Sequence, residues 1–248
     1  MRAGYMPAVG VAEFRDDMPE PQIEKADDVK IRVRNCGICG SEVHAIHGLH
    51  PFRIPPIVSG HEVAGDVVAV GEGVTKFKVG DRVTVEPHYG CGHCWYCDHG
   101  LYNVCPDKKV LGAGPWSGGL GEYIVTPEQT VVKLPDSLTY EEGALIEPVA
   151  NGMYAVRNSK IDEETNIVVI GCGPIGIGDF LCARLYDPRS ILMVDVADFN
   201  LQKARAMGAE LTCNSRRAAV SERAIELTGA AAHDHASLPA ALPAARRP

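Results

Sequence analysis

The sequence lacks an excess of positive charge and a long uninterrupted hydrophobic run. The 248-residue chain has a formal net charge of -8 at pH 7, and its Lys and Arg residues form no stripe. Because phosphate binding needs a concentrated basic surface, nucleic acid is excluded as the main partner. The longest apolar stretch begins at Ile167 but is broken by Gly171, Gly173 and Pro174. It is too short to span a bilayer, so we expect no membrane partner.

The sequence also lacks a secretory leader, because residues 1–14 have neither a long apolar core nor a cleavage site. We therefore expect a cytoplasmic protein in which cysteines stay reduced. The chain is 46% hydrophobic, which is enough to bury the core of one large or two modest domains.

The most specific motif is a group of four cysteines with the spacing C-x2-C-x2-C-x7-C. Its members are Cys91, Cys94, Cys97 and Cys105. Disulfides or passive packing are the alternatives, but in a reducing compartment this spacing favours one tetrahedral zinc ion. Four thiolates leave no coordination position open for a substrate, so the predicted site is structural.

Residues 1–155 alternate short β-rich runs with Gly, Pro and Asp, which predicts an irregular, largely antiparallel barrel with little helix. The runs are 29–35, 61–70, 81–87, 121–127 and 130–135. This range is predicted to be a metal-binding catalytic domain.

Residues 156–229 change to an α/β pattern. Strands are expected at 167–171 and 191–195, each followed by a helix, at 174–186 and 200–209, which predicts a parallel sheet. Residues 221–229 read as one more helix. The last part, 230–248, is rich in Ala, Pro and Arg without a strand pattern, and we expect it to be a disordered tail.

A G-x-G-x-x-G motif joins the first of these strands to its helix. It comprises Gly171, Gly173, Pro174, Ile175 and Gly176. Glycines here permit a tight turn and close approach of a pyrophosphate to the helix N-terminus. Asp195 ends the next strand, where a carboxylate binds the ribose hydroxyls and repels a 2′-phosphate, so NAD is predicted rather than NADP.

A second set of potential metal ligands is spread over the first domain. Its members are Cys39, His61, Glu62 and Glu147. Mixed Cys, His and carboxylate donors are typical of a catalytic zinc that keeps a position open for water or substrate. Each residue also has an ordinary structural interpretation: a buried thiol, a loop histidine or a carboxylate at a helix start.

Seven sequence signatures occur in order over residues 1–215. They are CGICGSEVH, GHEVAG, VGDRV, the four-cysteine segment, GGLGEYIV, EEGALIEPVA and GCGPIG. In these the chain resembles the zinc-dependent medium-chain alcohol and polyol dehydrogenases, and it looks closest to the sorbitol and butanediol branch. The resemblance implies a GroES-like catalytic domain followed by a Rossmann-type nucleotide-binding domain, of which the second half is missing here.

The resemblance also implies the role of each residue. Cys39 and His61 become zinc ligands, while Glu62 or Glu147 ligates directly or through water; which carboxylate does so stays open. Ser41 occupies the family position whose hydroxyl bonds the substrate oxygen. His44 occupies the position of the histidine that relays the proton to solvent. Glu42 replaces the usual aspartate that orients the zinc-bound histidine.

The implied reaction is hydride transfer from a secondary alcohol or polyol to NAD, with one catalytic and one structural zinc. Family members form homo-dimers or homo-tetramers. The alternative is a catalytically incomplete zinc-binding remnant, because the family's chains run longer than this one. A zinc-based redox sensor built on the four cysteines is a third hypothesis, which no exposed low-pKa thiol in the sequence supports.

Overall fold

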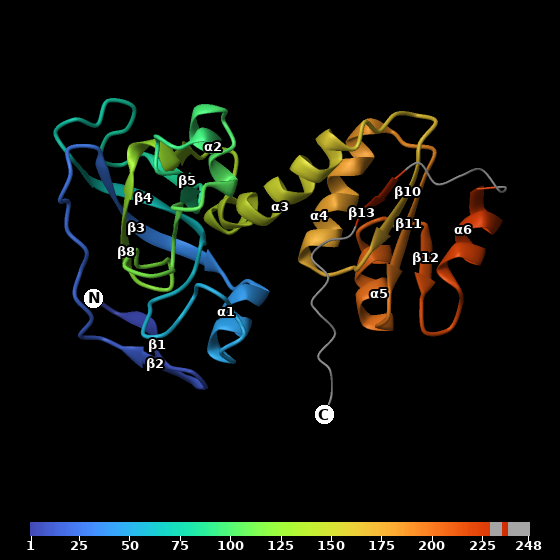
Figure 1. Cartoon of the computed structure of the whole chain (residues 1–248), viewed down its shortest axis with the longest axis horizontal. Coiled ribbons are helices and arrows are strands. Elements are labelled where there is room, and N and C mark those ends of the chain that lie inside the picture. The colour runs from blue at the N-terminus through green and yellow to red at the C-terminus, as the bar shows by residue number, and fades with distance from the viewer. Residues whose placement is uncertain (229–234, 238–248) are drawn as a thin grey trace. The chain divides into compact units, whose positions relative to one another are not determined.

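The computed structural model describes residues 1–228 and 235–237 (Figure 1). The chain divides into two compact units, Met1–Glu147 and Pro148–Pro248. The division falls within helix α3, Tyr140–Asn158, whereas the sequence placed the domain boundary between residues 155 and 156.

The first unit is built around a five-stranded antiparallel sheet, which confirms the predicted β-rich class. The strand order is β8-β3-β4-β5-β9. The bounds are β3 Asp28–Gly37, β4 Glu62–Val70, β5 Arg82–Val85, β8 Tyr123–Pro127 and β9 Val131–Lys133. Each strand coincides with one of the five β-rich runs of the sequence.

β-Branched side chains fill the core of this unit, as expected for strands with one buried face. The fully buried β-branched side chains include Val29, Ile31, Val63, Val67, Val83 and Ile124, and Leu111 packs among them. The pairing of β3 with β4 sets Gly37 opposite Glu62. The end of β3 therefore lies beside the start of β4, which brings together two segments that carry predicted ligands.

Shorter elements complete the first unit. Strands β1 Ala3–Ala8 and β2 Val11–Arg15 form a hairpin, and β6 His88–Tyr89 pairs with β7 Lys109–Val110. The helical elements are α1 Gly40–Ile46, α2 Trp95–Asp98, η1 Tyr102–Val104 and η2 Glu128–Thr130.

Helix α3 corrects the prediction of little helix before residue 155. It runs for 19 residues with Pro148 inside it, so Glu147 lies in the middle of a helix rather than at a helix start. Its glycines are packing contacts: an ideal Cβ on Gly143 would lie 2.9 Å from the Ala64 Cβ. Gly and Pro interrupt the apolar pattern that would identify a helix in the sequence, whereas tertiary packing stabilises this helix in the fold.

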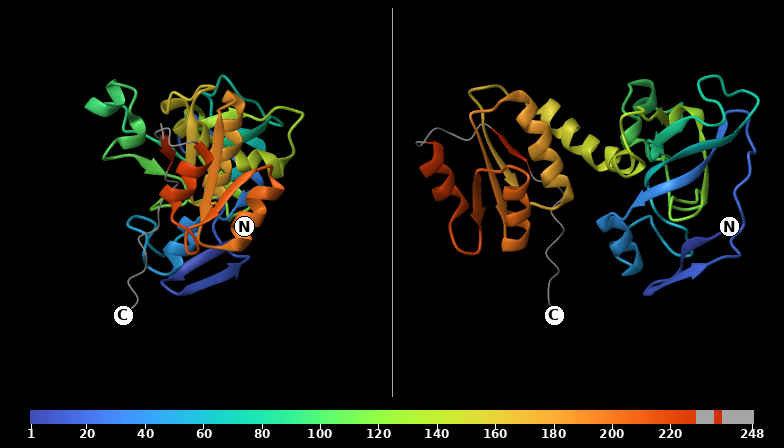
Figure 2. Two further views of the ribbon diagram at one scale, coloured as in Figure 1. Left: turned by 90° about the vertical axis from the view of Figure 1, so that its right-hand side faces the viewer. Right: turned by 180° about the vertical axis from the view of Figure 1, so that it is seen from behind.

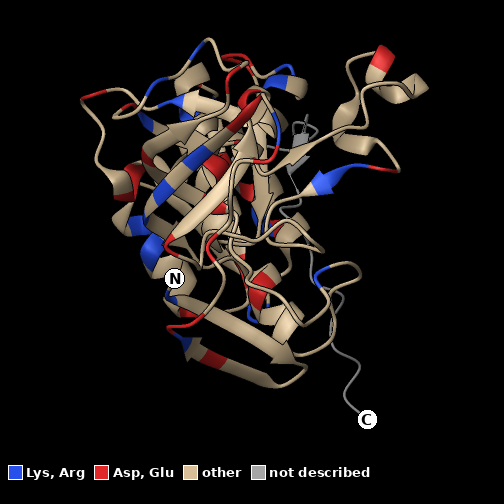
Figure 3. Cartoon of the chain, turned by 90° about the vertical axis from the view of Figure 1, so that its left-hand side faces the viewer, with Lys and Arg blue, Asp and Glu red and all other residues tan. Residues whose placement is uncertain are grey.

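Opposite charges are interspersed on the side of the chain shown in Figure 3. Ion pairs in the first unit include Arg34 Nε with Asp66 Oδ2 at 2.6 Å and Lys30 Nζ with Glu20 Oε1 at 2.6 Å. No helix in residues 1–228 has both the length and the apolar character needed to cross a membrane.

The second unit contains the predicted parallel sheet, with strand order β12-β11-β10-β13. In chain order its elements are β10 Asn166–Ile170, α4 Pro174–Ala183, η3 Arg184–Tyr186, β11 Ser190–Asp195, α5 Asp198–Ala206, β12 Leu211–Asn214 and α6 Val220–Thr228. The Rossmann-type α/β class is thus confirmed.

Helices cover both faces of this parallel sheet (Figure 2). On one face Phe180 of α4 and Leu201 of α5 pack in a cluster with Val169 and Met193. On the other face Ala224 of α6 packs in a cluster with the neighbouring strand residues Val168, Leu192 and Val194. Strands buried on both faces explain the continuous apolar runs in the sequence.

A short strand differs from the prediction that residues 230–248 lack regular structure. Strand β13, His235–Ser237, pairs in parallel with β10. Backbone pairing at a sheet edge needs no periodic side-chain pattern, which explains why the sequence did not reveal it. The rest of the predicted tail lies outside the described residues.

Candidate metal centres and nucleotide loop

The four predicted zinc ligands of the first motif converge in one lobe, residues 91–105, which we call the four-cysteine lobe. The Sγ atoms of Cys94 and Cys97 are 3.5 Å apart, those of Cys94 and Cys105 are 3.7 Å apart, and those of Cys91 and Cys97 are 4.0 Å apart. All four thiols are free of disulfides. Helix α2 begins directly after Cys94 and carries Cys97 on its single turn.

These separations fit a tetrahedral zinc ion. Zn–S bonds of about 2.3 Å place the sulfurs of a tetrahedron about 3.8 Å apart. A backbone N–H from Cys91 reaches Cys105 Sγ at 3.4 Å and lowers the pKa of that thiol to about 7. The thiolate is the form that binds a metal, so the donor chemistry also fits.

The second set of predicted ligands converges from three distant segments. Cys39 caps the N-terminus of α1, His61 and Glu62 lie at the start of β4, and Glu147 comes from α3. Ligand atoms of His61, Glu62 and Glu147 all lie within 4.8 Å of one another. Those of Cys39, His61 and Glu42 form a second such group, so His61 belongs to both.

The electrostatics of this centre favour a cation. A hydrogen bond with His61 outweighs burial and holds the pKa of the Cys39 thiol below its usual value. Burial alone would lower the pKa of His61, but hydrogen bonds with Cys39 and Glu42 raise it to about 9. Burial, with Glu147 and Glu42 nearby, raises the pKa of Glu62. A thiol, an imidazole and two carboxylates so gathered are a typical donor set for zinc.

Ser41 and His44 both lie on α1, one turn apart on the same face. Ser41 Oγ is buried and has no hydrogen-bond partner of good geometry among the described residues, although it is near enough to the Cys39 thiol to help lower the pKa of that thiol. A buried hydroxyl normally has a partner, so this one fits a site that receives a polar ligand. His44 is half-buried, which places it between the interior and solvent.

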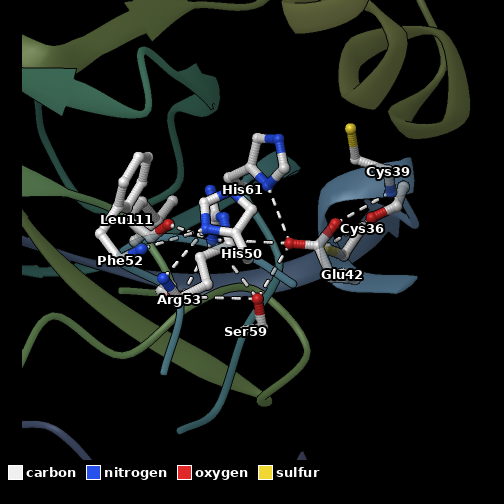
Figure 4. A network of polar contacts seen from close by, with 11 residues as sticks. Cys36, Cys39, Glu42, His50, Phe52, Arg53, Ser59, His61 and Leu111 are labelled. Carbon is white, nitrogen blue, oxygen red and sulfur yellow. Dashed lines mark hydrogen bonds and ion pairs between the residues drawn. The ribbon is translucent and has the colours of Figure 1, made fainter. Parts of the chain in front are cut away.

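A network around Glu42 was only partly anticipated from the sequence (Figure 4). Glu42 Oε1 lies 3.0 Å from His61 Nδ1, as expected for a carboxylate that orients a ligating histidine. Arg53 and Ser59 also contact this carboxylate, at 3.5 Å and 2.9 Å. Neither residue belongs to a recognisable motif, so no sequence pattern signals their role.

The glycine motif forms the turn between β10 and α4. Gly171 has a φ of 109°, a conformation that side chains disfavour. Gly173 caps the helix and Pro174 occupies its first position, followed by Ile175 and the buried Gly176. Peptide N–H groups at such a helix start are suited to binding phosphate.

Asp195 ends β11 and lies beside this turn. Its Oδ2 accepts a hydrogen bond of 2.8 Å from the Cys172 N–H and one of 3.1 Å from Asn200 Nδ2. Its Oδ1 accepts from the Ala197 N–H at 2.8 Å. Burial opposes ionisation, but these donors outweigh it and hold the pKa of Asp195 below its usual range. A carboxylate is thus fixed beside the glycine turn.

Comparison with known proteins gives the family. Residues 25–136 match the alcohol dehydrogenase GroES-like domain. Sorbitol dehydrogenase from Bacillus subtilis (strain 168) is 36% identical over 243 residues, which cover 94% of this chain and 69% of that protein. The chain belongs to the zinc-dependent medium-chain alcohol and polyol dehydrogenase family. This confirms the resemblance seen in the sequence.

Solved structures of this family have the same fold. The 2R,3R-butanediol dehydrogenase from Bacillus subtilis has a TM-score of 0.82 at 36% identity, with 92% of this chain and 67% of that chain covered. A protein described as a short chain alcohol dehydrogenase from E. coli CFT073, in complex with NADH, has a TM-score of 0.83 at 31% identity, with 92% of this chain and 66% of that chain covered.

The chain is shorter than its curated relatives. It spans 69%, 58% and 51% of the length of three of them. The matched part of this family's fold includes both candidate metal centres and the glycine turn.

Proposed function

We propose that this protein is a zinc-dependent oxidoreductase that transfers a hydride from a secondary alcohol or polyol to NAD. The observation that carries the proposal is the pair of ligand groups that share His61: Cys39 lies in one group, and Glu62 and Glu147 lie in the other. The similarity to a sorbitol dehydrogenase and a butanediol dehydrogenase supports the substrate class.

Two zinc ions are proposed. Cys91, Cys94, Cys97 and Cys105 would hold a structural ion, and Cys39, His61 and one or both of Glu62 and Glu147 would hold a catalytic ion. When bound, the catalytic ion supplies Lewis acidity that lowers the pKa of the substrate hydroxyl. With Cys39, His61 and one carboxylate as ligands, a tetrahedral zinc would keep its fourth coordination position free for that hydroxyl.

Residues of α1 would move the proton. Ser41 Oγ, which is buried beside the Cys39 thiol, would bond the substrate oxygen and accept its proton. His44 would pass the proton from this hydroxyl to solvent, a role suited to a half-buried imidazole, which can accept a proton on one nitrogen and donate one from the other.

NAD is the proposed hydride acceptor. Gly171, Gly173, Pro174, Ile175 and Gly176 would form the pyrophosphate-binding turn. Asp195 would bind the adenosine ribose and repel a 2′-phosphate, which favours NAD over NADP. Similar dehydrogenases bind this class of cofactor, one with NADH and one with NADP, so the choice of NAD rests on Asp195.

The proposed setting is a homo-dimer or homo-tetramer in the cytoplasm. Four thiolate ligands must stay reduced, which suits that compartment. Large apolar side chains exposed on the four-cysteine lobe, such as Trp95 at 60% and Val104 at 53%, support a contact surface there.

Turnover of the full chain tests the function. Zinc-loaded protein with NAD and a panel of secondary alcohols and polyols should produce NADH, and Cys39→Ser should abolish this together with zinc binding at that centre. Cys36→Ser is the matched control, because the Cys36 thiol donates to the carbonyl of Gly37 and a serine hydroxyl can make the same bond. A chain that binds zinc at both centres yet oxidises no substrate would contradict the proposal.

A further inference from the structure

Arg53 is a buried arginine in the loop that leads from α1 to β4. Only 4% of it is exposed. Its Nη1 donates hydrogen bonds to the carbonyl oxygens of Leu111 and Gly112 at 3.0 and 2.9 Å, and it lies 3.3 Å from Ser59 Oγ. Burying a guanidinium is costly unless it is paired, so these partners define one position for it.

Glu42 connects this arginine to both predicted zinc ligands (Figure 4). Glu42 Oε1 lies 3.5 Å from Arg53 Nη1 and 3.0 Å from His61 Nδ1. Glu42 Oε2 accepts the backbone N–H of Cys39 at 2.9 Å, which caps α1. One carboxylate therefore contacts the ring of one ligand and the backbone of the other.

A cation beside Glu42 stabilises its buried negative charge. A histidine that ligates a metal is neutral and donates its second N–H to a carboxylate, which stays anionic. The Glu42 side chain is only 3% exposed, so this charge is buried. Within the described part of the chain, Arg53 is the only Lys or Arg whose side chain lies within ion-pair distance of Glu42.

We propose that Arg53 is a positioning residue for the catalytic metal centre: it holds Glu42 where this carboxylate orients His61 and Cys39. The inference rests on the proposed function, in which these two residues hold zinc. It also gives a reason for glutamate at position 42. The longer side chain reaches the Cys39 N–H with one oxygen while the other stays beside Arg53 and Ser59.

The zinc affinity of the Cys39 and His61 centre tests the inference. It is measured on the full chain by competition with a chelator, with the zinc of the four-cysteine lobe as internal reference. Arg53→Gln should weaken zinc binding at this centre about 10- to 100-fold, as loss of an orienting contact does, and leave the lobe loaded. Arg53→Lys keeps the positive charge but lacks the planar guanidinium with its several N–H donors. The loss of zinc affinity in this variant should therefore be smaller than in Arg53→Gln.

A double-mutant cycle separates positioning from a structural role. If Arg53 acts through Glu42, then Arg53→Gln in a Glu42→Gln background should change zinc affinity by no more than about twofold. An equal loss in both backgrounds, or no loss in either, would overturn the inference. If Arg53→Gln does not fold, the same comparison is made with Arg53→Lys in the wild-type and Glu42→Gln backgrounds.

Arg82→Gln is the matched control. Arg82 also donates to backbone carbonyls of the first unit, those of Pro135, Asp136 and Leu138. Its loss should leave zinc affinity unchanged. Wild-type protein that binds zinc only in the four-cysteine lobe would refute the proposed function, whereas wild-type binding at both centres with no effect of Arg53 would refute this inference alone.

Discussion

Gly90 lies against the thiol of Cys97 in the four-cysteine lobe. An ideal Cβ at this position would stand 2.5 Å from the Cys97 Sγ and 2.9 Å from the Tyr102 Cβ. Backbone freedom is the reason for a glycine at position 92, where φ is +82°. For Gly90 the reason is different, since a side chain would displace a metal ligand.

Gly90→Ala should therefore weaken zinc binding by the lobe. Overpacking of this kind destabilises a fold by about 1–3 kcal/mol. Here the added methyl group would destabilise the zinc-bound form of the lobe, because it displaces the Cys97 thiol. Zinc content after dialysis against a weak chelator and the thermal unfolding midpoint measure the effect. Gly4→Ala is the control, because its nearest neighbour would be at 3.7 Å, an ordinary contact. Equal zinc retention in both variants would contradict the prediction.

Single residues differ in how far the sequence revealed them. The four cysteines were predictable because their ligand spacing is local, and the structure brings their sulfurs together. Cys39, His61 and Glu147 come from distant segments, so only the family resemblance connected them. Arg53 and Ser59 could not be predicted, because their role depends on a buried contact that only the folded chain creates.

Among the secondary-structure elements, strand β11 determines the predicted cofactor, because its last residue is Asp195. Asp195→Asn removes the negative charge that repels a 2′-phosphate, so the preference for NAD over NADP should fall by at least about tenfold. The ratio of the dissociation constants of the two cofactors measures it. Asp187→Asn removes the same charge from an exposed residue with φ of 48°, which asparagine tolerates, and should leave the ratio unchanged. An unchanged ratio in Asp195→Asn would contradict the assignment.

Elements with a clear hydrophobic period were predicted correctly. The strands β3, β4 and β10 and the helices α4 and α5 all lie where the pattern placed them. Helix α3 was missed because Gly143, Pro148 and Gly152 interrupt its pattern, although the two glycines let it pack closely. Strand β13 was missed because its pairing depends on the edge of β10 rather than on its own side chains.

At the scale of the whole molecule, both candidate metal centres belong to the first unit, Met1–Glu147. Removal of zinc by a strong chelator should therefore destabilise this unit by at least about 2 kcal/mol, since metal binding is coupled to folding. Hydrogen exchange followed by mass spectrometry should show faster exchange in residues 88–110 and little change in β10 and β11. Equal acceleration in both units would contradict this.

The gathering of four sulfurs within 4.8 Å of one another in the lobe has a consequence for the amount of this protein in a cell. A metal that binds only the folded lobe stabilises it by mass action, so each tenfold rise in free zinc above the dissociation constant adds about 1.4 kcal/mol. The steady-state amount of folded protein then follows the supply of the metal. Zinc starvation would lower the abundance of this protein before any change in its synthesis.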